Sequence, residues 1–158
     1  KNLCNSTKGN TLILYTYVEK HGDLLSEMLE ELSDKEVFYI HGKIDAKIRE
    51  EVRKKVESMN NALILASYGT FSTGINIKNL HNVIFASPTK SKIRSLQSIG
   101  RGLRLGDDKE SCTLFDLCDD FSTKKKTNYM IKHGTERMKI YIKEDFEIES
   151  VTVSFTEN

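Results

Sequence analysis

The chain has 158 residues, with one proline and nine glycines, which is the size of one domain with at most a small appendage. Charged residues make up 30% and hydrophobic residues 38%, a balance typical of soluble globular proteins rather than of disordered tails or membrane proteins. Lysine plus arginine (24) nearly equals aspartate plus glutamate (23), so the net charge is only +1. Any polyanion must therefore bind through local patches.

The three cysteines are Cys4, Cys112 and Cys118, and their spacing matches no paired CxxC motif. This usage favours reduced thiols in an intracellular protein. No apolar run approaches the ~18 residues needed to span a bilayer, and the first residues do not resemble a secretory signal. We therefore expect a cytoplasmic protein. Because the chain begins at Lys1 without an initiator methionine, we also expect it to be part of a longer polypeptide.

The first 60 residues alternate apolar runs with amphipathic stretches. Residues 11–17 and 37–40 are β-branched and aromatic runs with the composition of buried strands. Residues 19–32 repeat leucine and methionine at intervals of three and four, and residues 44–59 carry isoleucine and valine four apart, which predicts a helix after each strand. Asp45 stands where its charge would complement the N-terminal dipole of the second helix.

The alternation continues through the middle of the chain. Residues 62–66, 81–86 and 112–117 are predicted strands, with a predicted helix at 92–101. Nearly continuous hydrophobic strands that alternate with helices predict an α/β fold, a doubly wound parallel sheet with helices on both faces. A basic stretch at 122–141, which contains Lys124–Lys126, is compatible with a helix, and alternating apolar residues predict a terminal strand at 146–155. We divide the chain into a domain core (1–121) and an extension packed on the same domain (122–158).

Polar loops follow the predicted strands, at the edge where ligands gather in open parallel sheets. Residues 67–76 are rich in hydroxyls and glycine, whose polar groups can hold phosphate oxygens, although an ordinary polar turn would have the same composition. His41 and Gly42 follow the second strand, where the histidine would contact a nucleic-acid backbone or cap local hydrogen bonds. No histidine has a second ligand at metal-binding spacing, so we predict no metal site.

The segment 97–104 carries two arginines. Intervals of four and three place Gln97, Arg101 and Arg104 on one stripe of a helix. Glycines on both sides of Arg101 would each weaken a helix interior by ~1 kcal/mol, which indicates that something approaches the backbone closely. Arginine suits nucleotide phosphates and can stabilise charge on a transferring phosphoryl group. The alternative is a solvated basic helix end favoured by the macrodipole.

The order of these segments resembles the second RecA-like domain of superfamily 2 helicases. The pieces look like motifs IV, IVa, V and VI, which would be Tyr15-Thr16-Tyr17, His41-Gly42 with Arg49, residues 67–76, and Gln97-x-x-Gly100-Arg101-x-x-Arg104. They span about residues 11–119 in the family's order, and QxxGRxxR is the most specific of them. Within the superfamily, the sequence as a whole most resembles a phage type of recombination and replication-fork helicase.

The resemblance implies a role for each matching residue. Arg101 and Arg104 would be arginine fingers that reach the γ-phosphate of ATP, with Gln97 supporting them. Gly74, Asn76 and Gly100 would lie beside the nucleotide, with Asn76 near the ribose. The nucleic-acid track would be lined by residues at three strand ends, namely Tyr15, Thr16, His41, Gly42 and Ser67. Asn76 and Ser98 depart from the family, since many members carry Asp and Arg there.

The sequence lacks GxxxxGK[ST] and lacks an Asp-Glu pair after a strand, so the groups that hold the β/γ-phosphates and Mg²⁺ are missing. The resemblance therefore implies a P-loop NTPase-like domain without its P-loop, paired with an N-terminal RecA-like domain of the same chain that holds ATP and Mg²⁺. The whole would be an ATP-dependent DNA helicase or translocase that remodels branched DNA by fork regression and branch migration in recombination and repair. The fragment alone is predicted to be inactive, with DNA as its partner, no membrane, and the host cytoplasm as its location.

Other functions remain open at this point. The motor part of a restriction enzyme would share the same motifs. A non-catalytic nucleic-acid-binding module would keep the fold, but it would have no reason to retain Arg101, Arg104 and the glycines around them. A Rossmann-like cofactor enzyme is disfavoured, because no GxGxxG follows the first strand.

Overall fold

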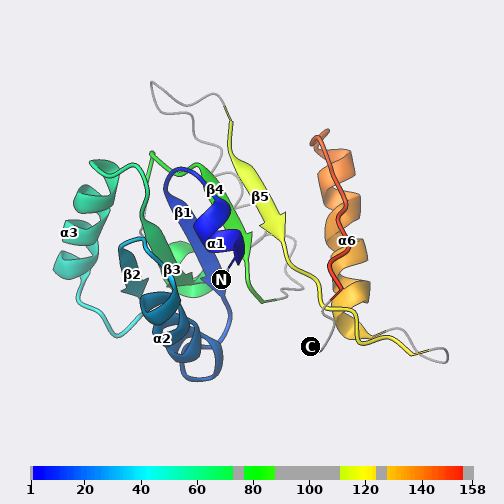
Figure 1. Cartoon of the computed structure of the whole chain (residues 1–158), viewed down its shortest axis with the longest axis horizontal. Coiled ribbons are helices and arrows are strands. Elements are labelled where there is room, and N and C mark those ends of the chain that lie inside the picture. Colours follow the sequence, from blue (N-terminus) through cyan, green and yellow to red (C-terminus); the bar gives the residue numbers. More distant parts are fainter. Residues whose placement is uncertain (1, 73–76, 88–110, 124–127, 155–158) are drawn as a thin grey trace.

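The computed structural model describes residues 2–72, 77–87, 111–123 and 128–154 (Figure 1). Its centre is a five-stranded parallel sheet in the order β2-β3-β1-β4-β5. The strands are β1 (Thr11–Tyr15), β2 (Val37–Ile40), β3 (Leu63–Ser67), β4 (Asn82–Phe85) and β5 (Thr113–Asp116). Each coincides with a strand predicted in the first 117 residues, with ends that differ by at most two positions. The predicted parallel α/β fold is therefore confirmed.

The two longer helices of the first half lie where the apolar periodicity places them. A single π-helical turn, η1 (Val18–Gly22), leads into α2 (Asp23–Leu32), so the predicted helix at 19–32 has a wider first turn. The next helix, α3 (Ala46–Glu57), begins after Asp45, whose side chain accepts a hydrogen bond of 2.7 Å from the backbone N–H of Lys47. Asp45 is thus the N-cap of this helix, as its position in the sequence indicates.

Two short helices were not expected from the sequence. They are α1 (Asn2–Ser6), before the first strand, and α4 (Tyr68–Ser72), at the start of the segment predicted as a loop. Each has only five residues, which is too short for a helical repeat of apolar side chains to be recognised. The prediction of a loop directly after β3 is therefore wrong for residues 68–72.

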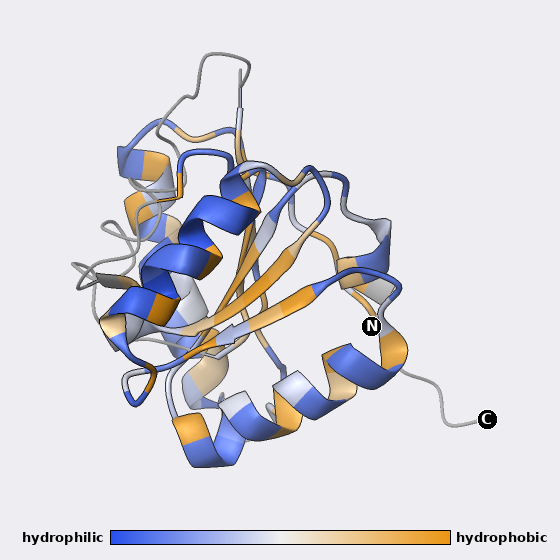
Figure 2. Cartoon of the chain, turned by 90° about the vertical axis from the view of Figure 1, so that its left-hand side faces the viewer, coloured by the Kyte–Doolittle hydropathy of each residue, from blue (hydrophilic) through white to orange (hydrophobic). Residues whose placement is uncertain are grey.

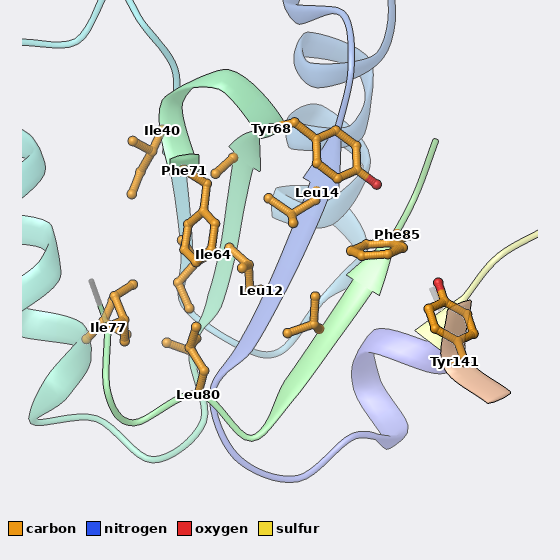
Figure 3. Close-up of a cluster of buried hydrophobic side chains, with 14 residues drawn as sticks. Leu12, Leu14, Ile40, Ile64, Tyr68, Phe71, Ile77, Leu80, Phe85 and Tyr141 are labelled. Carbon is orange, nitrogen blue, oxygen red and sulfur yellow. The ribbon is translucent and has the colours of Figure 1, made fainter. Parts of the chain in front are cut away.

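Alternate residues of the central strands face opposite sides of the sheet and form two hydrophobic clusters. Leu12 and Leu14 belong to one cluster, together with the residues drawn in Figure 3, whereas Ile13 and Tyr15 belong to the other. Both faces of the sheet are therefore buried, which explains why its strands are apolar at nearly every position. Figure 2 shows the apolar strands behind helices whose outward surfaces are mainly hydrophilic.

The C-terminal part differs most from prediction. Its helix, α6 (Tyr129–Lys143), begins after Asn128 rather than at residue 122, because the Asn128 side chain accepts a hydrogen bond of 2.9 Å from the N–H of Ile131 and caps the helix. The predicted terminal strand is wrong over residues 146–154, which have no strand pairing. Asp145, with φ of 58°, turns the chain after α6, and Val151 and Val153 remain largely exposed.

The predicted helix at 92–101 and Lys124–Lys126 lie outside the described residues. Within the described ranges, no helix combines the length and the apolar composition that crossing a bilayer requires.

Candidate nucleic-acid-binding edge of the sheet

Parallel strands bring the five predicted nucleic-acid residues to one edge of the sheet. Tyr15 ends β1 in register with Ser67 at the end of β3, and Ile40 at the end of β2 is in register with Ala66. Thr16, His41 and Gly42 directly follow these strand ends. We call this set of five residues, Tyr15, Thr16, His41, Gly42 and Ser67, the strand-end edge. The structure thus gathers segments that are up to 52 positions apart in the chain.

Tyr15 is the most deeply buried residue of the strand-end edge and does not reach its surface. Its side chain is 0% exposed, and its ring centroid is 6.1 Å from that of Tyr39. The Tyr39 hydroxyl donates a hydrogen bond of 2.7 Å to Asp23 at the start of α2. Burial raises the pKa of both tyrosines, so both hydroxyls stay protonated. Tyr15 therefore supports the edge from below.

Gly22, in the turn before α2, is a residue whose importance the sequence did not reveal. A Cβ atom placed there would lie 2.5 Å from the Tyr39 hydroxyl oxygen and 2.6 Å from the Tyr15 ring. No side chain fits at such distances without moving one of the two rings. Glycine therefore lets this turn pack directly on the aromatic pair that supports the edge.

Replacing Gly22 with alanine should destabilise the fold by about 2 kcal/mol, because overpacking a close contact typically costs 1–3 kcal/mol. Gly69→Ala is the matched control, since a Cβ atom at Gly69 in α4 meets nothing within 4 Å. That control should leave stability unchanged or raise it slightly. Urea unfolding followed by circular dichroism measures both variants, and equal stabilities for them would contradict the assigned contact.

His41 and Gly42 connect the end of β2 to the turn before α3. The His41 ring packs against Tyr39, with centroids 4.9 Å apart, and its Nδ1 atom accepts a weak hydrogen bond of 3.4 Å from the Lys43 N–H. Gly42 is exposed, and a Cβ atom there would lie 3.9 Å from Thr70 Oγ1. The turn after β2 therefore lies next to the first turn of α4, and the partly exposed His41 ring is held against Tyr39.

The Ser67 side chain forms hydrogen bonds within the turn that begins α4. Its hydroxyl lies 2.8 Å from Thr70 Oγ1 and accepts a hydrogen bond of 3.2 Å from the Thr70 N–H. This pattern closes the first turn of α4, and the Ser67 side chain is buried. The hydrogen bonds of the Ser67 hydroxyl are thus those of an ordinary polar turn, which was the alternative considered for residues 67–76.

Thr16 is bonded to a residue that the sequence did not single out. Its Oγ1 atom lies 2.9 Å from the hydroxyl of Ser87, which follows β4. The backbone carbonyl of Ser87 accepts a hydrogen bond of 3.3 Å from the Tyr68 hydroxyl. The Tyr68 ring in turn packs on Phe85, with centroids 5.6 Å apart. The ends of β1, β3 and β4 are therefore joined beside Thr16.

A buried ion pair joins the last strand of the sheet to α6. The Arg137 guanidinium donates two hydrogen bonds of 2.7 Å to the two carboxylate oxygens of Asp116, at the end of β5. The Tyr141 hydroxyl donates a third, of 2.9 Å, to the same carboxylate. Burial and the Asp116 charge raise the pKa of Tyr141, which keeps it a donor. This contact, which the sequence did not reveal, fixes α6 against the sheet.

The other predicted site residues fall on parts of the chain that the structure does not describe. They are Gly74 and Asn76, after α4, and the four residues of the arginine-bearing segment, Gln97, Gly100, Arg101 and Arg104. Their assignments remain predictions from the sequence.

Comparison with known proteins gives consistent matches. The family described as "Helicase conserved C-terminal domain" matches residues 1–106. The chain is 37% identical over 155 residues to the ATP-dependent DNA helicase UvsW of Enterobacteria phage T4, which covers 92% of this chain and 30% of the phage protein. The chain therefore spans less than a third of the length of that relative.

Solved structures with the same fold include other helicase domains. The yeast DEAD-box splicing factor Prp28 superposes with a TM-score of 0.68 at 15% identity, covering 90% of this chain and 29% of that one. Domain 2 of the DEAD-box helicase Mss116p, solved bound to an RNA duplex, superposes with a TM-score of 0.58 at 21% identity, covering 75% and 44%. At these identities the structures establish the RecA-like fold alone. The match of the family model over residues 1–106, more than half of the chain, shows that this chain belongs to the helicase conserved C-terminal domain family.

Proposed function

We propose that this chain is the C-terminal RecA-like domain of an ATP-dependent DNA helicase or translocase that remodels branched DNA, by fork regression and branch migration in recombination and replication repair. The observation that carries the proposal is the 37% identity to the T4 DNA helicase across 92% of the chain. The gathering of polar residues at the strand-end edge supports it. By the same similarity we propose that the protein works in the cytoplasm of the host cell.

In the proposed complex, DNA lies across the strand-end edge. Thr16, His41 and Gly42 are at least partly exposed and offer a hydroxyl, an imidazole and a backbone N–H, groups that commonly contact phosphate and sugar. Tyr15 and Ser67 are buried and would hold these groups in place. The net charge of +1 is in keeping with release between steps, because each phosphate that a protein neutralises adds affinity and salt dependence.

The described residues contain no phosphate-binding loop, and no three or more His, Cys, Asp or Glu side chains gather among them at metal-binding distance. We propose that an N-terminal RecA-like domain of the same chain binds both. Arg101 and Arg104, supported by Gln97, would face the triphosphate from this domain, and Gly74, Asn76 and Gly100 would lie beside the nucleotide.

We also propose that residues 1–121 form the domain core and that residues 122–158 are an extension of the same domain. The ion pair between Asp116 and Arg137 supports the placement of the extension on the same domain, because it connects the last strand of the core to α6 and both side chains are largely buried.

Unwinding assays on the full-length protein test the proposed function. Forked, four-way and simple duplex DNA are each incubated with ATP or with a non-hydrolysable analogue. We expect ATP-dependent remodelling, with the four-way and forked substrates converted faster than the simple duplex. Equal conversion with the analogue would indicate a binding module, and conversion of the simple duplex alone would rule out branch remodelling.

The isolated 158-residue chain should show no ATPase activity and only weak binding to DNA that decreases as salt is raised, because it lacks the phosphate-binding loop and carries a net charge of +1. A coupled ATPase assay and fluorescence anisotropy with labelled forked DNA measure the two properties. ATP turnover that co-purifies with the chain through successive columns would contradict the assignment of the phosphate site to another domain.

A further inference from the structure

The hydroxyl of Thr16 has only one hydrogen to donate. A phosphate oxygen only accepts hydrogen bonds, so Thr16 can hold one only by donating that hydrogen outward. The same Oγ1 atom lies 2.9 Å from the hydroxyl of Ser87. Both contacts can exist together only if Ser87 donates to Thr16. The direction of the Thr16–Ser87 hydrogen bond therefore decides whether Thr16 can bind the DNA backbone.

Ser87 is placed to act as this donor. Its side chain is 4% exposed, and within the described part of the chain its hydroxyl is bonded to Thr16. Its backbone carbonyl is held by the hydroxyl of Tyr68, which is itself buried on Phe85. Thr16 is partly exposed whereas Ser87 is buried, so the Thr16 hydrogen is the one of the pair that can reach a ligand in solvent.

We propose that Ser87 is a positioning residue of the nucleic-acid site, which donates its hydroxyl hydrogen to Thr16 and thereby directs the Thr16 hydrogen outward to a phosphate oxygen of the bound strand. The inference rests on the proposed function, because it requires Thr16 to contact DNA. Tyr68 contributes by holding the Ser87 backbone. Ser87 itself does not touch the DNA.

A double-mutant cycle in the full-length protein tests this role. The dissociation constant for a fluorescein-labelled forked DNA is measured by anisotropy, without nucleotide and at one salt concentration. Ser87→Ala should weaken binding about threefold to tenfold, the usual value of one hydrogen bond, and Thr16→Val should weaken it at least as much. Because Ser87 acts through Thr16, the double variant should bind no more weakly than Thr16→Val alone.

Matched variants separate positioning from a general loss of structure. Ser26→Ala is the control, because Ser26 is also buried and its hydroxyl donates a hydrogen bond of 3.2 Å within α2, to Glu30, which is not one of the residues of the strand-end edge. It should leave DNA affinity unchanged. Thr16→Ser keeps the hydroxyl and should keep the dependence on Ser87. If Ser87→Ala does not fold, Ser87→Cys, which has nearly the same size and is a weaker donor, replaces it in the same cycle.

The outcomes distinguish this inference from the proposed function. Weakening by Thr16→Val together with wild-type affinity for Ser87→Ala would overturn the role of Ser87 and leave the DNA contact of Thr16 intact. Additive losses in the double variant would also overturn it, because Ser87 would then act independently of Thr16. Wild-type affinity for Thr16→Val would overturn the DNA contact at Thr16 and the role of Ser87 with it.

Discussion

Replacing Arg101 with alanine in the full-length protein should lower kcat for ATP hydrolysis about 10³-fold or more and leave ATP affinity nearly unchanged. An arginine finger stabilises charge that develops only in the transition state, so its loss raises the barrier without weakening the ground-state complex. The same result is expected for Arg104→Ala. Arg101→Lys should recover little activity, because an ammonium group lacks the planar, forked geometry that matches phosphate oxygens.

Steady-state ATPase kinetics in saturating DNA, with nucleotide affinity measured separately by a fluorescent analogue, check this prediction. Arg53→Ala is a suitable control, because Arg53 lies on α3 and forms ion pairs of 2.7 Å with Glu50 and Glu57 on the same helix. Its removal should leave kcat unchanged. Near-normal turnover in both Arg101→Ala and Arg104→Ala would remove the arginine-finger assignment and favour a non-catalytic module.

The sheet could be predicted from the sequence because burial on both faces leaves a strong local signal. Residues 63–67 are buried throughout, and the sequence has an uninterrupted apolar run over residues 62–66. The prediction of a terminal strand was wrong because the local pattern does not determine whether a segment pairs with another strand. Alternating apolar residues at 146–155 fit a strand, but a strand also needs a partner strand to pair with, and residues 146–154 pair with none.

The strand-end edge could be predicted only in outline. Parallel strands must bring their carboxyl ends together, so the positions of Thr16 and His41 follow from the order of the elements. The supporting contacts do not. Thr16 and Ser87 are 71 positions apart, and Gly22 meets Tyr15 and Tyr39 only after the turn before α2 has packed on the sheet. Such contacts depend on tertiary packing, for which a single sequence carries no periodic signal.

The link between the sheet and α6 depends on the buried ion pair of Asp116 and Arg137. The Arg137 side chain is 4% exposed and that of Asp116 is 18% exposed, so a guanidinium group left without its carboxylate would remain largely out of water. Removing one partner of a buried pair typically costs 3–5 kcal/mol. Asp116→Asn should therefore lower the free energy of unfolding by about 3 kcal/mol, which corresponds to a decrease in Tm on the order of 10 °C.

Two companion variants make this prediction specific to burial. Glu136→Gln, which breaks the exposed pair of Glu136 and Lys139 on the same helix, should cost less than about 1 kcal/mol. The triple variant Asp116→Leu/Arg137→Met/Tyr141→Phe replaces the ion pair and the hydroxyl bonded to it with apolar side chains and should recover most of the stability, since such exchanges are often neutral. Thermal and urea unfolding measure all three variants. If the triple variant were no more stable than Asp116→Asn, the loss of the buried Asp116 carboxylate beside Arg137 would not be the source of the destabilisation, and α6 would be held mainly by other contacts.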